Sequence, residues 1–163
     1  MSRPGAIQRF LAEAEAVGLQ VDVREFPEGT RTARDAARAI DCDVAQIVKS
    51  LVFVAGDEPF LALTSGPNRA DTARLAELMD GRSVRQADAN EARTATGFAI
   101  GGTPPFGHPA PLRVFCDRDL LEHEVVWAAG GTPSSVFPIS PADLLRASGA
   151  EPADFKERSQ RGS

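Results

Sequence analysis

The stretch KSLVFVAGDEPFLALTSG, residues 49–66, decides the fold. It contains two apolar runs rich in Leu, Val and Phe, separated by turn-forming residues, and this pattern predicts a β-hairpin. Lys49 stands at the start of the first strand, directly after the segment DVAQ. DVAQ has the form of a capping box and predicts a short helical turn over residues 44–48. A lysine at such a turn-to-strand junction can direct its side chain into a cleft.

Helical and strand patterns are interspersed on both sides of this hairpin. Helices are indicated by apolar residues at helical spacing with cap residues at their ends, and strands by alternating or continuous apolar runs. We therefore expect a single α/β or α+β domain with a mixed sheet over residues 1–155, and a frayed polar tail at 156–163. The expected helices are 7–17, 32–40, 71–81, 88–96 and 141–150, and the further strands are 19–26, 112–116, 124–131 and 134–140.

The composition narrows the classes of function. The chain has 163 residues, 42% hydrophobic residues and a formal net charge of −5. An acidic protein is not a general electrostatic binder of nucleic acid, so no DNA partner is expected, and an RNA partner would need a local basic patch or a helper protein. No apolar run approaches the roughly 20 residues of a membrane span, and the N-terminus lacks the apolar core of a signal peptide. We expect a cytoplasmic protein without a membrane partner.

Familiar catalytic and metal-binding patterns are absent from the sequence. There is no GxSxG elbow, no Walker loop and no HExxH motif. His108, His123 and Cys116 do not have an established ligand spacing, so neither a metal nor another cofactor is expected. Cys42, near a helix end, and Cys116, inside a strand, are expected to be small buried residues rather than nucleophiles.

Two features nevertheless point to a site. In GGTPPFG, residues 101–107, glycines allow backbone N–H groups to face an anionic or carbonyl oxygen, and prolines stiffen the loop. The same loop could equally be a rigid connection between strands. Lys49 is one of only two lysines beside 16 arginines. It could hold a phosphate or carboxylate as a point charge, or it could simply extend its ammonium group into water.

Four segments in this order carry a family resemblance: VAQIVKSLVF, TSGPNRADTARLAELMDG, TGFAIGGTPPFGH and AAGGTPSSVFPISPADLLRASGA. Over roughly residues 5–150 the chain resembles the YbaK/EbsC family, which is similar to the editing domain inserted in bacterial prolyl-tRNA synthetases. The resemblance implies a compact domain with a curved mixed sheet around one pocket. It also implies a trans-acting aminoacyl-tRNA deacylase that proofreads tRNA for proline and requires no protein nucleophile.

The resemblance also assigns roles to residues. Lys49 matches the family lysine that engages the 3′-terminal nucleotide, and the GxxxP loop that positions the ester corresponds to Gly101, Gly102, Thr103, Pro104 and Pro105. Ser50 and Gly131 are expected to line the same pocket. The branch that edits cysteinyl-tRNA has Tyr near Phe26 and Asp near Val136. Here both positions are apolar, so alanine becomes at least as plausible a target as cysteine.

Two hypotheses of function remain open. The first is an aminoacyl-tRNA deacylase acting on a small amino acid such as Ala or Cys, with weak tRNA affinity or the help of a synthetase. The second is an inactive binding module that recognises an amino acid, a nucleotide or a synthetase. Arg31, Arg34 and Arg38 share one helix side, which could contact the tRNA backbone or could be an ordinary solvated face.

Overall fold

The computed structural model describes residues 5–26 and 32–158, and its central feature is the hairpin of β2 (Ile47–Ala55) and β3 (Glu58–Ser65). The two strands pair antiparallel, with Lys49 opposite Thr64. Gly56, in the turn, has φ +62°, a left-handed conformation that glycine adopts without strain. The predicted hairpin is confirmed.

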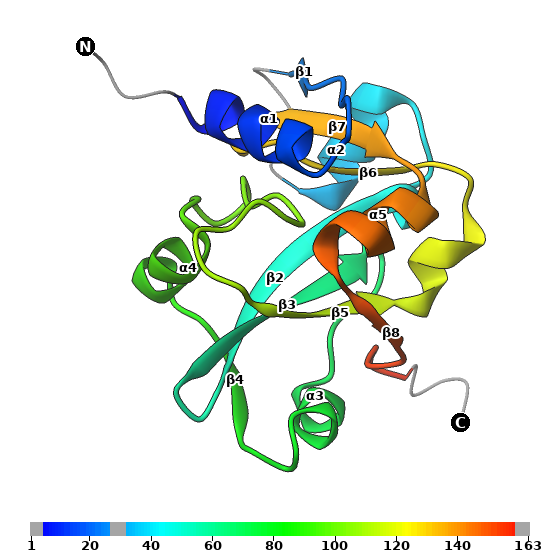
Figure 1. The fold of residues 1–163 in the computed structure, drawn as a ribbon. Helices are drawn as coiled ribbons and strands as arrows, with labels where there is room; N and C mark the ends of the chain where they lie inside the picture. Colours follow the sequence, from blue (N-terminus) through cyan, green and yellow to red (C-terminus); the bar gives the residue numbers. More distant parts are fainter. Residues whose placement is uncertain (1–4, 27–31, 159–163) are drawn as a thin grey trace.

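The hairpin is the middle of an eight-stranded mixed sheet (Figure 1). The strand order is β1-β7-β6-β2-β3-β5-β8, and β4 also pairs with β2. The β2–β6, β3–β5 and β5–β8 pairs are parallel and the others are antiparallel. The predicted curved mixed sheet is therefore confirmed. The remaining strands are β1 (Arg24–Glu25), β4 (Val84–Gln86), β5 (Arg113–Asp117), β6 (Val126–Ala129), β7 (Ser135–Ile139) and β8 (Glu151–Ala153).

Three of the helices begin with the cap residues or the first-turn proline that the sequence predicts. The Thr32 hydroxyl accepts a hydrogen bond from the Asp35 N–H at 3.0 Å, and Asp88 and Glu91 form a reciprocal capping box. Pro141 occupies the first turn of the last helix. The helices are α1 (Ala6–Ala16), α2 (Ala33–Ile40), α3 (Thr72–Leu78), α4 (Ala89–Thr96) and α5 (Pro141–Ser148), with 3₁₀ turns η1 (Val44–Gln46) and η2 (Arg118–Glu122).

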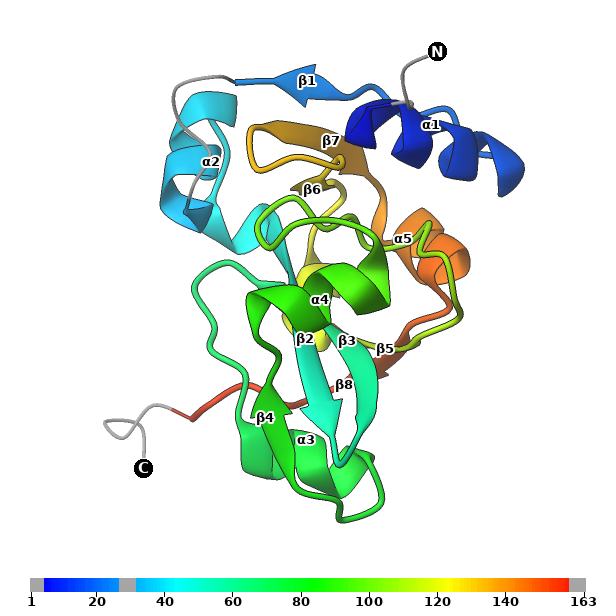
Figure 2. The same ribbon diagram turned by 90° about the vertical axis from the view of Figure 1, so that its left-hand side faces the viewer.

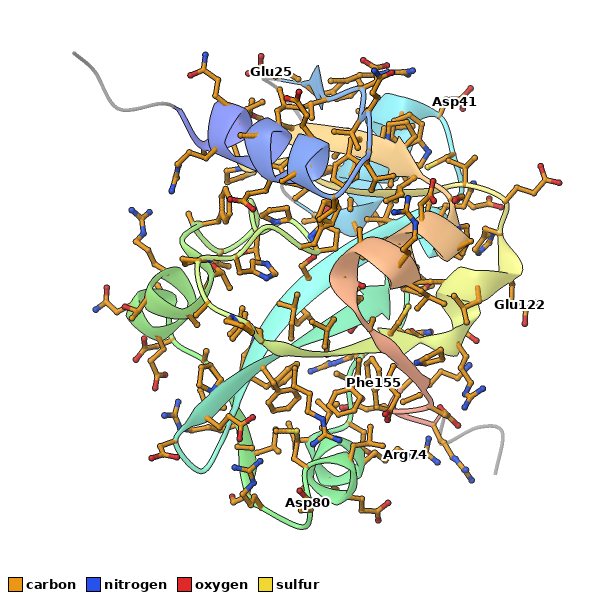
Figure 3. The ribbon with its side chains drawn as sticks, in the orientation of Figure 1. Glu25, Asp41, Arg74, Asp80, Glu122 and Phe155 are labelled. Atoms are coloured by element: carbon orange, nitrogen blue, oxygen red, sulfur yellow. The ribbon has the colours of Figure 1, made fainter. Side chains whose placement is uncertain are left out.

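Apolar residues cover both faces of β2, which explains its continuous apolar sequence. Val52 and Val54 belong to the larger cluster, which includes Phe10 from α1. Phe53 belongs to a second cluster on the other face, where Phe155 packs between the sheet and α3 (Figure 3). In Figure 2, α4 lies across the β2–β3 hairpin. The alternation of side chains along β2 therefore places these two clusters on opposite faces of the sheet.

One side of β2 is only partly paired, and this gap positions the site. The ladder with β6 contains only Ile47 and Val48, and the ladder with β4 contains only Phe53 to Ala55. Val52 accepts a hydrogen bond from the Ala87 N–H just beyond β4, so residues 49–51 are left without a strand alongside them on this edge. The sheet thus splits beside β2, between β6 and β4.

Three expectations about the elements need correction. Within 19–26 only Arg24 and Glu25 pair with another strand, although Leu19, Val21 and Val23 do pack on the core. Helix α3 ends at Leu78, before Gly81. The prediction of a frayed tail from Lys156 onward is wrong for its first residues, because the chain after the unpredicted strand β8 is held in place; residues 159–163 lie outside the described residues. Lys156 pairs with Ala70, and the Glu157 N–H donates to the Arg69 carbonyl at 2.7 Å.

Candidate functional site

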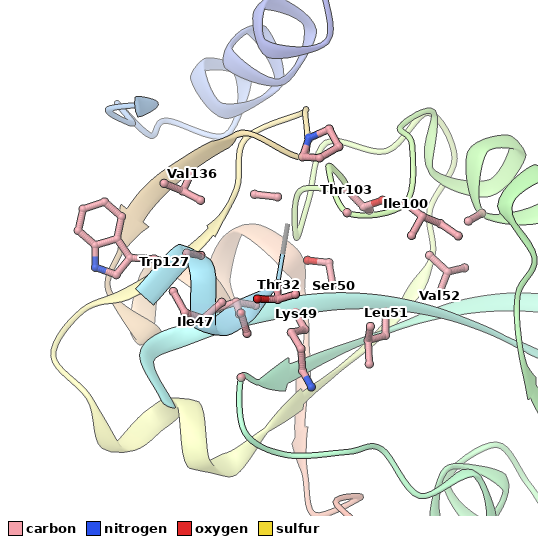
Figure 4. A pocket seen from close by; sticks show the side chains of 18 of the residues that line it. Thr32, Ile47, Lys49, Ser50, Leu51, Val52, Ile100, Thr103, Trp127 and Val136 are labelled. Atoms are coloured by element: carbon pink, nitrogen blue, oxygen red, sulfur yellow. The ribbon is translucent and has the colours of Figure 1, made fainter. Parts of the chain in front are cut away.

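A cavity of about 550 Å³ lies at the gap in the sheet (Figure 4). Its volume lies within the range typical of small-ligand pockets. Most of its wall is apolar, and the polar groups come from β2, β4, β7, the start of α2 and the loop after α4. The apolar wall includes Ile47, Val48, Val52, Ile100, Trp127 and Val136.

Lys49 and Ser50 both line this cavity, but their side chains leave β2 in opposite directions (Figure 4). Successive residues of a strand project to opposite faces of the sheet. Ser50 projects toward the side that holds Thr103, and Lys49 projects the other way. A molecule bound at the gap could therefore contact both faces of β2.

The ammonium group of Lys49 is partly withdrawn from water. Lys49 Nζ donates to the carbonyl oxygen of Asn68 at 2.5 Å. Burial lowers the pKa of Lys49 below its ordinary value and nearby Arg69 lowers it further, while Asp117 opposes this shift. A cation held in this way can attract an anionic group, and no direct ion pair with another described residue neutralises it.

Asn68 connects Lys49 to a network of charges. Its side-chain amide donates to Asp117 Oδ2 and Asp119 Oδ2, both at 2.8 Å, and Lys156 Nζ donates to Asp119 Oδ2 at 2.7 Å. Asp117 is buried and also accepts the Ser65 N–H at 3.0 Å. The hydrogen bond from Lys156, followed by that from Asn68, holds the pKa of Asp119 below its usual value. Both lysines of the chain thus meet at one polar cluster.

The loop Gly101–Pro105 is built from its own hydrogen bonds. The Gly102 N–H and the Thr103 hydroxyl both donate to the Ala99 carbonyl, at 2.9 and 3.2 Å. A Cβ at Gly102 would lie 2.7 Å from the backbone of Thr132, so only glycine permits this approach. Because the Gly102 amide already has an acceptor, it is not available as an oxyanion donor in this arrangement.

Residues behind the loop hold it in place. His108 Nε2 lies 2.9 Å from the Pro104 carbonyl oxygen, to which it can donate. Burial lowers the pKa of His108, which favours the neutral form of the ring, while the hydrogen bond to Pro104 opposes this shift. Phe106 packs its ring against Phe10 and Phe137, with centroids 5.1 and 6.2 Å away. The loop is therefore positioned before any ligand arrives.

The structure brings together five of the nine residues predicted for the site. Those lining the cavity are Lys49, Ser50, Gly101, Thr103 and Val136. Four others are not among the described lining residues: Phe26, Gly102, Pro105 and Gly131. Gly131 instead packs closely against the backbone of Ala6. A Cβ added to Gly131 would lie only 2.8 Å from the Ala6 carbonyl oxygen, so a side chain would not fit there. The backbone N–H of Phe26 donates to the Ser134 carbonyl at 2.7 Å.

Sequence reasoning missed several residues of the site. Asn68 lies in the quoted segment TSGPNRAD, but only the fold shows that it contacts Lys49. Asp117 is the last residue of β5, and the end of a buried strand is a usual position for a functional carboxylate. The wall residues Trp127 and Ser135 come from β6 and β7, far from Lys49 in sequence. No local pattern could have connected them to the hairpin.

Other chemistries find no support among the described residues. Burial raises the pKa of the Cys116 thiol to about 12, and burial and Asp43 raise that of Cys42. Within residues 5–26 and 32–158, no group of three or more His, Cys, Asp or Glu residues is arranged to hold a metal ion. In the same ranges, no helix is long and apolar enough to cross a membrane.

The sequence and the fold correspond to a known class of protein. The sequence profile of the aminoacyl-tRNA editing domain matches residues 27–147, and the chain belongs to this family. The predicted resemblance is thereby confirmed. The chain superposes on the crystal structure of a candidate trans-editing enzyme for prolyl tRNA synthetase with a TM-score of 0.90 and 46% identity, covering 96% of this chain and all of the other.

The sequence is also similar to those of two curated proteins. It is 32% identical over 124 residues to the uncharacterized protein YwhH of Bacillus subtilis, covering 76% of this chain and 78% of YwhH. It is also 29% identical over 102 residues to the proline–tRNA ligase of Nitratidesulfovibrio vulgaris. That match covers 63% of this chain and only 18% of the ligase.

Proposed function

We propose that this protein hydrolyses the ester bond of mischarged aminoacyl-tRNA, with the aminoacyl group held in the cavity beside β2. The substrate is tRNA for proline carrying a small amino acid such as Ala or Cys, and the reaction serves translational proofreading in the cytoplasm. The observation that carries the proposal is the position of Lys49. It lies at the gap in the sheet, on the same strand that lines the cavity.

The chemistry needs little from the protein beyond positioning. An aminoacyl ester is already activated, so placing water and stabilising the developing oxyanion supply most of the acceleration. Among the described residues that line the cavity there is no His, Cys, Asp or Glu. This composition favours a reaction that relies on groups of the substrate itself rather than on a protein base or nucleophile.

Five of the predicted residues then have a part in the reaction. Lys49 holds a phosphate near the 3′ end of the tRNA as a compact cation. The loop containing Gly101 and Thr103 faces the ester, while Gly102 gives the loop its shape. Val136 closes an apolar wall where a carboxylate would otherwise contact the substrate. Exclusion of larger groups by such a wall favours a small side chain.

The RNA partner is held weakly or with assistance. The protein has a net charge of −5, and Arg34 and Lys49 are the only cations among the described lining residues. The family domain also occurs within proline–tRNA ligases, as the match to the Nitratidesulfovibrio protein shows. A synthetase is therefore the partner we expect to deliver or retain the tRNA.

A panel of charged tRNAs tests this proposal. Wild-type protein should release Ala or Cys from tRNA for proline, and Lys49→Ala should slow the release by about 100-fold or more, a transition-state loss of roughly 3 kcal/mol. Circular dichroism and thermal melting of the variant confirm that it is folded. If Ala-, Cys- and Ser-charged tRNAs all remain intact at high protein concentration, the proposal is wrong.

A binding module without turnover is the second candidate, and the absence of His, Cys, Asp and Glu from the described cavity lining favours it. Calorimetry with free amino acids and a non-hydrolysable aminoacyl-adenosine separates the two. Tight binding of the analogue, together with no release of amino acid from any charged tRNA, would identify a binding module.

A further inference from the structure

Ser50 has a side-chain hydroxyl that the protein itself does not satisfy. Its Oγ is buried and is the one such side-chain atom without a hydrogen-bond partner among the described residues. Buried hydroxyl groups are normally paired, because an unpaired one loses its bonds to water without replacement. An exception in a cavity wall suggests that the missing partner is a ligand.

The backbone of Ser50 faces the same gap. The N–H and C=O of successive residues in a strand point to opposite edges. The carbonyl of Val52 accepts the Ala87 N–H on the gap side, and Val48 pairs with β6 on that side, so Ser50 also directs its N–H and C=O there. Neither ladder on this edge includes Ser50. One residue thus offers three hydrogen-bonding groups next to the cavity.

The other hydroxyl groups around the cavity are satisfied. Ser135 Oγ donates to the Thr132 carbonyl at 3.1 Å and accepts the Thr132 N–H at 3.0 Å. The Thr103 hydroxyl donates to the Ala99 carbonyl, and the Thr32 hydroxyl caps α2. Ser50 is therefore set apart from its neighbours by its missing partner and not by its residue type.

We propose that Ser50 is a substrate-binding residue that hydrogen-bonds the aminoacyl group of the substrate. Its partner is a hydrogen-bonding group of the amino acid, either the α-amino group or a side-chain hydroxyl. This inference rests on the proposed function and deepens it. A rotation about χ1 moves the hydroxyl between staggered positions, so pairing requires no change in the strand.

If Ser50 binds the substrate, Ser50→Ala should lose activity without losing stability, a combination that a purely structural role of Ser50 would not produce. Ser50→Ala removes an unpaired buried hydroxyl, so the variant should melt at the same temperature as the wild type or up to about 4 °C higher. Its rate of ester hydrolysis should nevertheless fall by about 10-fold or more, because the substrate group is left unpaired. Ser50→Thr keeps the hydroxyl and should retain most of the activity.

Ser148→Ala is the matched control. The Ser148 hydroxyl in α5 donates to the Leu144 carbonyl at 2.6 Å and lies outside the described cavity lining. Removing this satisfied hydroxyl should lower the melting temperature and leave the hydrolysis rate unchanged. The two serine variants should thus show opposite patterns of stability and activity.

Single-turnover hydrolysis of alanyl- and seryl-tRNA for proline by wild type, Ser50→Ala and Ser50→Thr tests the inference. An equal loss on both esters in Ser50→Ala assigns the partner as the α-amino group, and a loss on the seryl ester alone assigns the side-chain hydroxyl. An active wild type with an equally active Ser50→Ala overturns the role of Ser50 and leaves the proposed function standing. A wild type that cleaves neither these esters nor the cysteinyl ester overturns both.

Discussion

Lys49 and Ser50 are adjacent in sequence, but the two sides of β2 on which they lie differ in how their polar groups are satisfied. On the Lys49 side, Asn68, Asp117, Asp119 and Lys156 form a continuous set of hydrogen bonds. On the Ser50 side the wall is mostly apolar, and the hydroxyl of Ser50 has no partner among the described residues.

This difference indicates that the polar groups on the Lys49 side stabilise the protein, whereas those on the Ser50 side bind the substrate. A fully paired polar network stabilises one geometry, whereas an unpaired buried group costs stability unless a ligand completes it. We infer that the network on the Lys49 side fixes the position of the Lys49 ammonium group. On the Ser50 side, the unpaired hydroxyl gains its partner only when substrate binds. Substitutions on the two sides should therefore have opposite effects on stability.

The largest effect on stability is expected for Asp117→Ala. Asp117 is buried and accepts hydrogen bonds from Ser65, Asn68 and Asp119. Its removal leaves these donors without an acceptor, and the free energy of unfolding should fall by about 3 kcal/mol. Urea denaturation measures the change. A loss well under 1 kcal/mol would mean that the Lys49 side is not the stabilising side, and the comparison with Ser50→Ala would fail.

The charge of Lys49 can be tested through pH. Because burial lowers its pKa, the ammonium is lost at a lower pH than that of an exposed lysine. If the cation binds the tRNA, kcat/KM should fall as the pH rises through this pKa, after correction for spontaneous ester hydrolysis. In Lys49→Arg the guanidinium stays charged, so any remaining activity should lack this alkaline decrease. A decrease that persists unchanged in Lys49→Arg would assign it to another group.

The smallest effect is expected for Lys156→Met. The Lys156–Asp119 ion pair is about 40% exposed on both sides, and exposed pairs contribute roughly 0–1 kcal/mol. The free energy of unfolding should change by less than about 1 kcal/mol, and the hydrolysis rate by less than about threefold. A loss of more than about tenfold in rate would show that Lys156 helps to position Lys49 through Asp119 and Asn68.

Local features of the fold could be predicted because they depend on neighbouring residues. The hairpin, the caps at Thr32 and Asp88 and the first-turn proline at Pro141 follow from short patterns. Strand β8 and the anchoring of Lys156 could not, because they depend on parallel pairing with β5 and on contact with the distant Ala70. Such non-local pairings leave no periodic signal.

The site was predicted in part for the same reason. The resemblance identified Lys49 and the loop around Thr103, and both line the cavity. The gap itself depends on where β6 and β4 stop pairing with β2, which no local pattern specifies. The opposite directions of Lys49 and Ser50 were available from the two-residue period of a strand. Lys49 and Ser50 can line one pocket, although they point to opposite faces, because the sheet is open at this edge of β2.

A crystal structure with a non-hydrolysable 3′-aminoacyl-adenosine analogue tests the central claim most directly. The aminoacyl group should lie in the gap between β6 and β4, with a polar atom within about 3 Å of a hydrogen-bonding atom of Ser50. The adenosine should extend toward Lys49. An analogue bound elsewhere on the protein, or bound in the cavity without contact to either residue, would contradict this account.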